Sequence, residues 1–402
     1  MAQQPFLKSI RPVNLLSFGP NTEEIELRSL NILIGPNGSG KSNLIEIIGL
    51  LKDLTGKEPW STILETGGVD EWIWKGMLRT DASKAVPPSI QMEYRPSENN
   101  RPRNYTIEFT KNPSTYSFHV RSESVSVEVP QDHSRFTYVN RPFSSPDTAF
   151  VYAGKSPLSK VEDLDVKLSL LTQLVDRANY PELSYLEQKL SGITLYRDWI
   201  FGVDANPRDP QPVGLGSGSL EEDTRNLAQV LKAWRDRGEQ AIFDRLRDLM
   251  KQFYEPVKDI DAELVGTHIR VVVKESSGFN TPAIRLSDGT LRWLALLIIL
   301  LNPTPPPVVC IEEPELGLHP DIIPTLADLL RDASTRTQLI LTTHSRTLIE
   351  CFSDDPESVC VCEKFDGATE IKRLEADRLK VWLEKYSLGQ LWLNGEIGGN
   401  RW

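Results

Sequence analysis

The sequence lacks any long apolar segment and is poor in cysteine. No run of 18 or more apolar residues is present, so no segment is expected to span a bilayer as a helix. The first 14 residues also lack the extended apolar stretch of a secretory signal. The four cysteines (Cys310, Cys351, Cys360 and Cys362) fit no zinc-binding spacing, and scattered thiols suit a reducing compartment. These absences predict a cytoplasmic protein with no membrane partner.

An excess of positive charge is also absent, since 45 lysines and arginines face 56 acidic residues and the formal net charge is −11. The net charge of the protein therefore does not favour binding of nucleic acid, although an acidic protein can still have a local basic surface patch. Arg95, Arg101 and Arg103 cluster in one expected loop. A second basic group is Arg225, Lys232, Arg235, Arg237, Arg245, Arg247 and Lys251. Acids alternate with this second group, which favours a solvated helix face over DNA contact and leaves DNA as an open partner.

Sustained heptads are missing too, which excludes a long coiled-coil arm. The 402 residues are 39% apolar and 25% charged, as is usual for a soluble globular protein. A chain of this length can bury a substantial core and carry an insertion. The composition therefore predicts one large folded domain with an insertion, or two lobes.

Hydrophobic patterns divide the chain into successive regions. Short strands are expected between residues 6 and 34, the last being a continuous apolar run, and a helix follows over 42–51. Residues 89–152 alternate between apolar and polar, which predicts antiparallel strands. Residues 157–254 look mainly helical, with a loop or linker over 204–219, and α/β character returns after residue 267.

The first chemical motif is the glycine-rich segment between the expected strand and helix, which matches G-x4-G-K-[ST]. Its glycines allow backbone N–H groups to converge on phosphate oxygens, and the helix N-terminus favours negative charge. Lys41 is expected to reach the β- and γ-phosphates, and the Ser42 hydroxyl to ligate Mg²⁺. The competing explanation is a glycine-rich loop with a chance Lys-Ser pair. The residues expected to bind the nucleotide here are Gly35, Pro36, Asn37, Gly38, Ser39, Gly40, Lys41, Ser42 and Asn43.

Two adjacent carboxylates, Glu312 and Glu313, end the apolar strand that begins at Val308. The first is expected to steady the hydrated Mg²⁺, and the second to polarise the attacking water as the catalytic base. Neighbouring side chains on a strand point to opposite faces, so stability alone explains the pair poorly. The competing explanation is a solvated strand end.

Two further motifs complete the set. His344 follows another apolar strand and is expected to sense the γ-phosphate, although a lone histidine in such a place is usually structural. Ser287, Asp288 and Gly289 precede an apolar helix. A hydroxyl, a glycine and a helix N-terminus can grip a phosphate, but an ordinary N-cap accounts for the same residues.

These four motifs, in this order, resemble the Walker A, signature, Walker B and switch-histidine motifs of ABC-class ATPases. The segments FLKSIRPVNLLSF, GPNGSGKSN, LSDGTLR and EEPELGLHP narrow the resemblance to the RecF/SMC-like branch, especially the stand-alone ATPases classed as AAA_21. It covers both ends of the chain, whereas the middle third matches only in general character.

The resemblance implies an α/β fold: a P-loop NTPase head of the ABC type, with a mixed sheet flanked by helices, an antiparallel β lobe and a helical insertion. The expected division is a first half of the ATPase core with Walker A, the β lobe, the helical insertion, and a second half with the signature, Walker B and switch histidine. The corresponding boundaries are 1–88, 89–156, 157–266 and 267–402.

The resemblance also implies ATP and Mg²⁺ as cofactors and a second copy of the chain as partner. In the family two heads enclose two ATP molecules, and the signature of one head completes the Walker A site of the other. Ser287 and Gly289 are therefore expected to act in trans, and residues 315–320 to form the D-loop.

A glutamine between Walker A and the signature usually contacts the metal in this family. Gln91 is the candidate metal ligand, and Gln131 and Gln173 remain alternatives. Two positions depart from the common pattern: Asp288 stands where transporters commonly have glycine, and Glu312 where an aspartate is common.

The expected function is an ATPase that dimerises on ATP and couples this to nucleic-acid transactions or to a partner effector nuclease, in DNA repair or anti-phage defence. The sequence shows no nuclease motif of the related kind, so cutting would belong to the partner. Two alternatives are a nucleotide-responsive scaffold with little turnover and, with less support, the ATPase subunit of a transporter.

Overall fold

The computed structural model describes residues 4–76, 86–96, 101–112, 114, 117–128, 135–153, 156–197, 202, 205–214 and 218–399. The chain forms two compact units, each built from separate stretches of sequence. The N-terminal unit comprises Gln4–Ile193, Glu357–Leu379 and residues 394–399. The C-terminal unit comprises Thr194–Pro356 and Lys380–Leu393. Among the described residues, no helix has the length and apolarity needed to cross a membrane.

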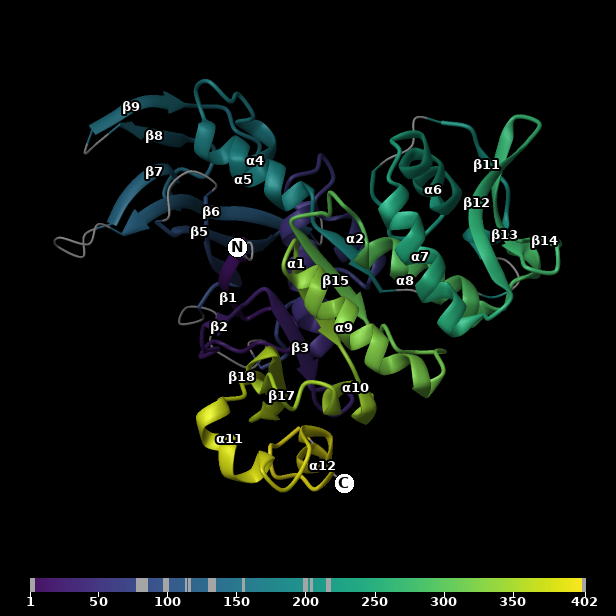
Figure 1. The fold of residues 1–402 in the computed structure, drawn as a ribbon. Helices are drawn as coiled ribbons and strands as arrows, with labels where there is room; N and C mark the ends of the chain where they lie inside the picture. The colour runs from purple at the N-terminus through teal and green to yellow at the C-terminus, as the bar shows by residue number, and fades with distance from the viewer. Residues whose placement is uncertain are drawn as a thin grey trace. The chain divides into compact units, whose positions relative to one another are not determined.

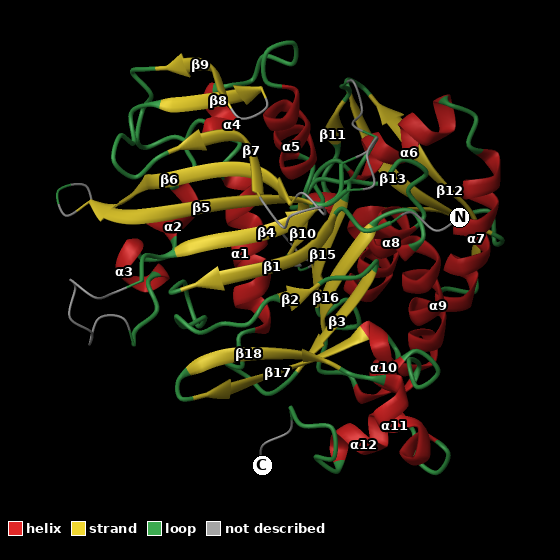
Figure 2. Ribbon diagram, turned by 90° about the vertical axis from the view of Figure 1, so that its left-hand side faces the viewer, coloured by secondary structure: helices red, strands yellow, loops and turns green. Residues whose placement is uncertain are grey.

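An antiparallel sheet dominates the N-terminal unit, and its strands lie side by side in Figure 2. Their order is β2-β1-β4-β5-β6-β7-β8-β9. Apolar and polar positions alternate along the middle strands, and the apolar ones are buried, as the period-2 pattern predicts. The bounds are β1 Leu7–Val13, β2 Ile25–Glu26, β4 Ser89–Tyr94, β5 Arg103–Asn112, β6 Ser117–Glu128, β7 Arg135–Arg141, β8 Ala149–Ala153 and β9 Ser156–Val161.

A second group of strands in this unit carries the glycine-rich loop. β3 (Leu30–Ile34) is buried along its whole length and runs parallel to β17 (Val359–Phe365), which pairs antiparallel with β18 (Ala368–Arg373). Cys360 and Cys362 are buried in β17, as expected of small packed side chains. The helices are α1 Lys41–Asp53, α2 Ser61–Glu65, α3 Val69–Trp72, α4 Leu170–Gln173 and α5 Pro181–Ser191.

The C-terminal unit contains three parallel strands in the order β10-β15-β16 and a nearly all-apolar helix, α8. Helix α8 (Asp288–Leu300) is buried from Thr290 onwards, which explains why its sequence is apolar on every side. The strands are β10 Thr194–Tyr196, β15 Val308–Glu312 and β16 Gln338–Thr342, and further helices are α9 Ile323–Ser334, α10 Arg346–Glu350 and α12 Leu388–Leu393. Helix α11 (Ala376–Leu383) has residues in both units.

A smaller antiparallel sheet lies beside helices α6 and α7 in the same unit (Figure 1). Helix α6 (Leu227–Asp236) and α7 (Gln240–Phe253) bury the apolar faces that the sequence predicts. Their sheet consists of β11 Gln211–Pro212, β12 Val257–Val265, β13 His268–Glu275 and β14 Asn280–Pro282.

The region expected to be mainly helical also contains strands. β9, β10 and β11 are short segments without a clear period, so their pairing partners elsewhere in the chain decide their conformation. The expected linker over 204–219 includes a 3₁₀ turn, η2 (Asn206–Arg208), and β11, so it is anchored to the C-terminal unit.

Candidate nucleotide site

The Walker A loop lies in the N-terminal unit and connects β3 to α1. Gly40 has φ +102°, and a Cβ placed there would lie 2.2 Å from Thr369 Oγ1 and 2.7 Å from Ser17 Oγ. Gly35 is equally confined, because its Cβ would lie 2.2 Å from the carbonyl oxygen of Cys362. Only glycine fits either position without displacing its neighbours. The loop therefore has the tightly curved backbone that brings N–H groups toward a phosphate.

Polar side chains of this loop suit a phosphate. Lys41 is 6% exposed, and its Nζ donates to the carbonyl oxygens of Gly35 at 2.8 Å and Pro36 at 3.0 Å. The hydroxyl of Ser39 is buried without a hydrogen-bond partner among the described residues. Ser42 follows in the first turn of α1, a 13-residue helix whose N-terminus adds partial positive charge. A curved loop, a lysine and an unsatisfied hydroxyl fit the triphosphate of a nucleotide.

Two residues that the sequence analysis did not identify support this loop. Thr369 on β18 donates its hydroxyl to the carbonyl oxygen of Ser39 at 2.8 Å, and its Oγ1 is hydrogen-bonded with the hydroxyl of Ser17 at 2.7 Å. Its backbone N–H donates to the carbonyl oxygen of Ser17 at 2.8 Å. Thr369 lies 330 positions from Ser39, so no local pattern could reveal the contact.

The Walker B carboxylates lie in the C-terminal unit, at the end of β15. Glu313 has φ +45°, a left-handed conformation that is uncommon for a residue with a Cβ and costs about 1 kcal/mol or more. Its N–H donates to the carbonyl oxygen of Thr342 at 3.0 Å, and its own carbonyl accepts from Arg292 Nη2 at 3.0 Å. Both backbone groups of the expected catalytic base are therefore held in place.

Glu312 forms an ion pair with Arg197. The Nε of Arg197 lies 3.1 Å from Glu312 Oε1, and both side chains are partly exposed. Arg197 follows β10, and the sequence analysis did not identify it. An Mg²⁺-bound water at Glu312 would share this carboxylate with the guanidinium of Arg197.

His344 and Glu313 are close to each other. Their Nε2 and Oε1 atoms are 4.0 Å apart, and both side chains remain exposed to solvent, at 37% and 40%. Glu315 links the loop after β15, which carries Glu313, to the loop after β16, which carries His344. Its Oε1 accepts from Thr343 Oγ1 at 2.5 Å and from the His344 N–H at 3.3 Å. Within this unit the structure thus brings together the expected catalytic base and the expected phosphate sensor.

Burial shifts the pKa of two charged groups beside these residues. It raises the pKa of the Glu315 carboxyl, and the nearby charge of Glu313 adds to this effect. It also lowers the pKa of Arg292 to about 10, an effect that the carboxylates of Glu315 and Glu313 partly oppose. Arg292 still carries its charge at neutral pH and compensates the two acids.

The signature segment has the N-cap geometry that its sequence allows. Ser287 Oγ accepts from the backbone N–H of Thr290 at 3.1 Å, which confirms the capping interpretation. A Cβ on Gly289 would lie 3.0 Å from the carbonyl oxygen of Gly317, so the expected D-loop packs directly against this turn. Asp288 is paired with Arg208. The role of Ser287, Asp288 and Gly289 in binding phosphate stays a prediction.

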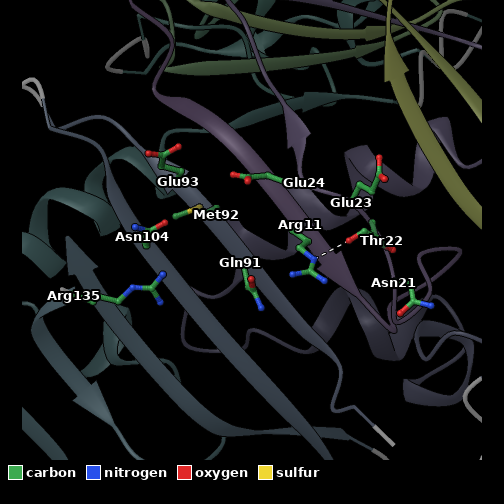
Figure 3. Close-up of a pocket in the computed structure, with 10 residues that line it drawn as sticks. All are labelled: Arg11, Asn21, Thr22, Glu23, Glu24, Gln91, Met92, Glu93, Asn104 and Arg135. Atoms are coloured by element: carbon green, nitrogen blue, oxygen red, sulfur yellow. Dashed lines mark hydrogen bonds between the residues drawn. The ribbon is translucent and has the colours of Figure 1, made fainter. Parts of the chain in front are cut away.

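Gln91, the candidate metal ligand, lies on β4 in the N-terminal unit and lines an open polar pocket of about 430 Å³ (Figure 3). The pocket residues are Arg11, Asn21, Thr22, Glu23, Glu24, Gln91, Met92, Glu93, Asn104 and Arg135. Arg11 lies between Gln91 and Thr22 in this view, and its Nε donates to the carbonyl oxygen of Thr22 at 2.7 Å. Metal binding by Gln91 stays a prediction.

The alternatives to Gln91 differ in position. Gln173 lies near the C-terminal end of α1, because the adjacent Thr172 donates to the carbonyl oxygen of Leu54 at 2.9 Å. The phosphate-binding end of this helix is its N-terminus, roughly 20 Å away. The amide of Gln173 donates to the carbonyl oxygens of Asp165 and Leu168 instead. This geometry weighs against Gln173, and Gln131 lies outside the described residues.

No protein cage for a metal is present in the part of the chain that the structure describes, where no three His, Cys, Asp or Glu side chains are suitably grouped. Magnesium does not require one, since it commonly takes one or two protein ligands together with phosphate oxygens and water. Binding of Mg²⁺ by Ser42 and by Glu312 stays a prediction.

Comparison with known proteins agrees with this picture. The family model AAA_21, described as "AAA domain, putative AbiEii toxin, Type IV TA system", matches residues 30–350. No curated protein is significantly similar in sequence to this chain.

Solved structures of SMC heads share the fold. An SMC head bound to the C-terminal winged-helix domain of ScpA is 13% identical, with a TM-score of 0.50 and coverage of 93% of this chain and 99% of that one. An SMC head with an extended coiled coil, bound to the C-terminal domain of ScpA derived from Pyrococcus furiosus, is 14% identical, with a TM-score of 0.50 and coverage of 95% and 99%. These likenesses confirm the expected P-loop head of the ABC type.

Proposed function

The chain belongs to the AAA_21 family of ATPase domains, and on that premise we propose that it binds ATP with Mg²⁺ and hydrolyses the ATP in a dimer of two copies. The observation that carries this proposal is the geometry of Glu313. Its strained backbone is hydrogen-bonded through both its N–H and its carbonyl, and its carboxylate lies 4.0 Å from His344. Strain that is maintained in this way is typical of functional sites.

The residues of the chain take distinct roles in this reaction. The amides of the Walker A loop and Lys41 bind the β- and γ-phosphates, and Ser42 contributes a hydroxyl ligand to the metal. When bound, Mg²⁺ would supply positive charge that stabilises the charge on the phosphates. Glu313 orients the attacking water and accepts its proton, and His344 donates a hydrogen bond to a γ-phosphate oxygen.

The signature segment supports the dimer. The first turn of α8 begins at Asp288, directly after the cap at Ser287, and its first backbone N–H groups point out of the helix end. Two apolar side chains are exposed nearby: Ile284, just before the signature, at 60%, and Leu316, in the expected D-loop that packs against this turn, at 56%. In the proposed dimer this surface contacts the nucleotide held by the second copy.

The test compares ATP turnover of the wild-type protein, Glu313→Gln and Lys41→Ala. Loss of a general base is expected to lower kcat by a factor of about 10² to 10⁴. Glu313→Gln should retain its affinity for ATP because the amide keeps the shape of the side chain, whereas Lys41→Ala should lose nucleotide binding. Equal and negligible rates in wild type and Glu313→Gln would instead favour a nucleotide-responsive scaffold.

We further propose that the dimer acts on a protein partner, an effector nuclease in DNA repair or anti-phage defence. The two SMC heads of similar fold are each bound to a domain of ScpA, and this observation supports a protein partner for the present chain. Purifying Glu313→Gln in ATP and in ADP tests this, since the partner should be enriched only in ATP.

Direct DNA binding has weaker support. Most basic residues on α6 and α7 form ion pairs, as expected of a solvated helix face. Arg103 is likewise paired with Glu182. Because these basic side chains are already paired with acids, we expect them to make few contacts with DNA phosphates. A DNA affinity that falls steeply with increasing salt concentration would contradict this expectation.

A further inference from the structure

Arg208 is a buried arginine in a segment that the sequence presents as a linker. It ends the 3₁₀ turn η2, and its side chain is only 8% exposed. An arginine is almost never buried to this extent unless its guanidinium is paired. The identity of its partners therefore indicates what the residue is for.

Arg208 donates hydrogen bonds to the segment that leads into the signature and to the signature itself, residues 283–288. Its Nη1 donates to the carbonyl oxygens of Ala283 at 3.1 Å and Leu286 at 2.7 Å. Its Nη2 donates to the carboxylate of Asp288, and its Nε anchors the other side to the carbonyl oxygen of Gly202 at 2.9 Å. The planar fork of a guanidinium fixes several acceptors at once, which an ammonium group cannot do. Arg208 thus sets the path by which the chain enters α8.

The ion pair between Arg208 and Asp288 affects how the N-terminus of α8 can bind a phosphate. Asp288 is 63% exposed in the first turn of α8, next to the hydroxyl of Ser287. A carboxylate there would repel a phosphate that approaches the helix end, because like charges at close range oppose each other. The guanidinium of Arg208 offsets that charge. The same pair explains why an aspartate is tolerated where transporters commonly have glycine.

We propose that Arg208 is a positioning residue of the signature: it shapes the Ala283–Asp288 loop and neutralises Asp288. Ser287 and the first backbone N–H groups of α8 can then donate hydrogen bonds to the γ-phosphate of an ATP molecule that is bound to a second copy. This inference rests on the ATP-dependent dimer proposed above. It assigns a role in that dimer to a residue 80 positions before the signature.

The test measures the dimer dissociation constant in Mg-ATP by analytical ultracentrifugation, with Glu313→Gln as background to prevent turnover. Adding Arg208→Met should weaken the dimer by about 10-fold or more, because a buried charge partner is lost. Adding Asp288→Asn to that variant should recover part of the loss, since it removes the unneutralised charge. Unchanged dimer affinity in Arg208→Met, or a loss that Asp288→Asn does not reduce, would overturn the inference.

Controls separate this result from misfolding and from failure of the dimer itself. Arg225→Met removes an exposed arginine, which pairs with Glu221 in the same unit, and should change nothing. Binding of a fluorescent ATP analogue to monomers reports the Walker A loop and should be the same in all variants. If Arg208→Met does not fold, Arg208→Lys takes its place. The lysine keeps the positive charge but loses the planar fork, so the dimer should still be weaker. Asp288→Asn should not restore that dimer, because the charge of Asp288 is already neutralised. A Glu313→Gln protein that stays monomeric in ATP would show that the proposed dimer has failed, independently of Arg208.

Mixing two impaired variants, Arg208→Met and Lys41→Ala, tests action in trans. Arg208→Met has an intact Walker A loop, and Lys41→Ala has an intact signature. A mixed dimer therefore contains one complete site if Arg208 serves the nucleotide of the other copy. Turnover of the mixture should exceed that of either variant alone, and the absence of recovery would contradict the inference.

Discussion

At the scale of single residues, the glycines of the Walker A loop differ in what surrounds them. A Cβ on Gly40 would lie 2.2 Å from Thr369 Oγ1, whereas a Cβ on Gly38 would have no neighbour within 4 Å. Both residues have positive φ, at +102° and +74°. A Cβ at Gly38 would therefore meet backbone strain alone, whereas a Cβ at Gly40 would meet backbone strain and a steric clash.

This difference predicts unequal effects of two alanine substitutions. Gly38→Ala should cost about 1–2 kcal/mol of stability, which is the usual strain of a left-handed residue with a Cβ. Gly40→Ala should cost more and should abolish nucleotide binding, because Thr369 and Ser17 must move away from the loop. Thermal unfolding and titration with an ATP analogue measure both effects. Equal losses of affinity in the two variants would contradict this account.

The residues of the site that the sequence predicts belong to local motifs, in which spacing alone defines the chemistry. Lys41 and Ser42 follow a strand and open a helix, and Glu313 ends an apolar strand. Arg208, Thr369 and other supporting residues could not be found in this way. Arg208 contacts Asp288 across 80 positions of sequence, and Thr369 contacts Ser39 across 330. No local sequence pattern identifies such pairs.

At the scale of elements, a buried polar cluster connects the β lobe to α4. The carboxylate of Glu123 on β6 accepts from Tyr105 on β5, from Ser169 and from the Leu170 N–H at the start of α4. Arg141 on β7 lies 3.9 Å from this carboxylate, and neither side chain is exposed. Burial raises the pKa of Glu123 more than its hydrogen bonds lower it.

Removing this carboxylate should destabilise the lobe strongly. Glu123→Ala leaves Arg141 as a buried charge without its acid and should cost about 3–5 kcal/mol. Chemical denaturation monitored by circular dichroism measures the loss. Substitution of the exposed Glu128 on the same strand provides a control and should cost less than about 0.5 kcal/mol.

The raised pKa of Glu123 also predicts a pH dependence. An acid whose pKa is higher in the folded state contributes stability below its ordinary pKa and loses it as the pH rises through the folded value. The stability of the wild type relative to Glu123→Gln should therefore fall as the pH rises above the ordinary pKa of a glutamate and through the raised pKa of Glu123. A difference that does not change with pH would show that this carboxyl titrates normally.

Long or strongly patterned elements were predictable, and short ones were not. α1 and α8 and the alternating strands β4 to β6 follow from periodicity and from flanking turn residues. β10 has three residues and exists because it pairs with β15, more than a hundred positions later. Its conformation depends on a partner strand that local sequence does not reveal.

At the scale of the whole molecule, the motifs expected to bind and hydrolyse ATP are divided between two units of the chain. The Walker A loop belongs to the N-terminal unit, and Glu313, His344 and Ser287 belong to the C-terminal unit. The proposed second copy adds a further requirement, because a signature that acts in trans cannot complete a site in a monomer. Turnover should therefore depend on protein concentration in the range where the dimer dissociates.

The most direct test of the central claim is the molar mass of Glu313→Gln in solution, measured by light scattering in Mg-ATP and in Mg-ADP. The account predicts the mass of two 402-residue chains in ATP and of one chain in ADP. The Lys41→Ala/Glu313→Gln double variant should have the mass of one chain in both nucleotides. A Glu313→Gln protein that binds ATP yet keeps the mass of a single chain would contradict the proposed ATP-dependent dimer.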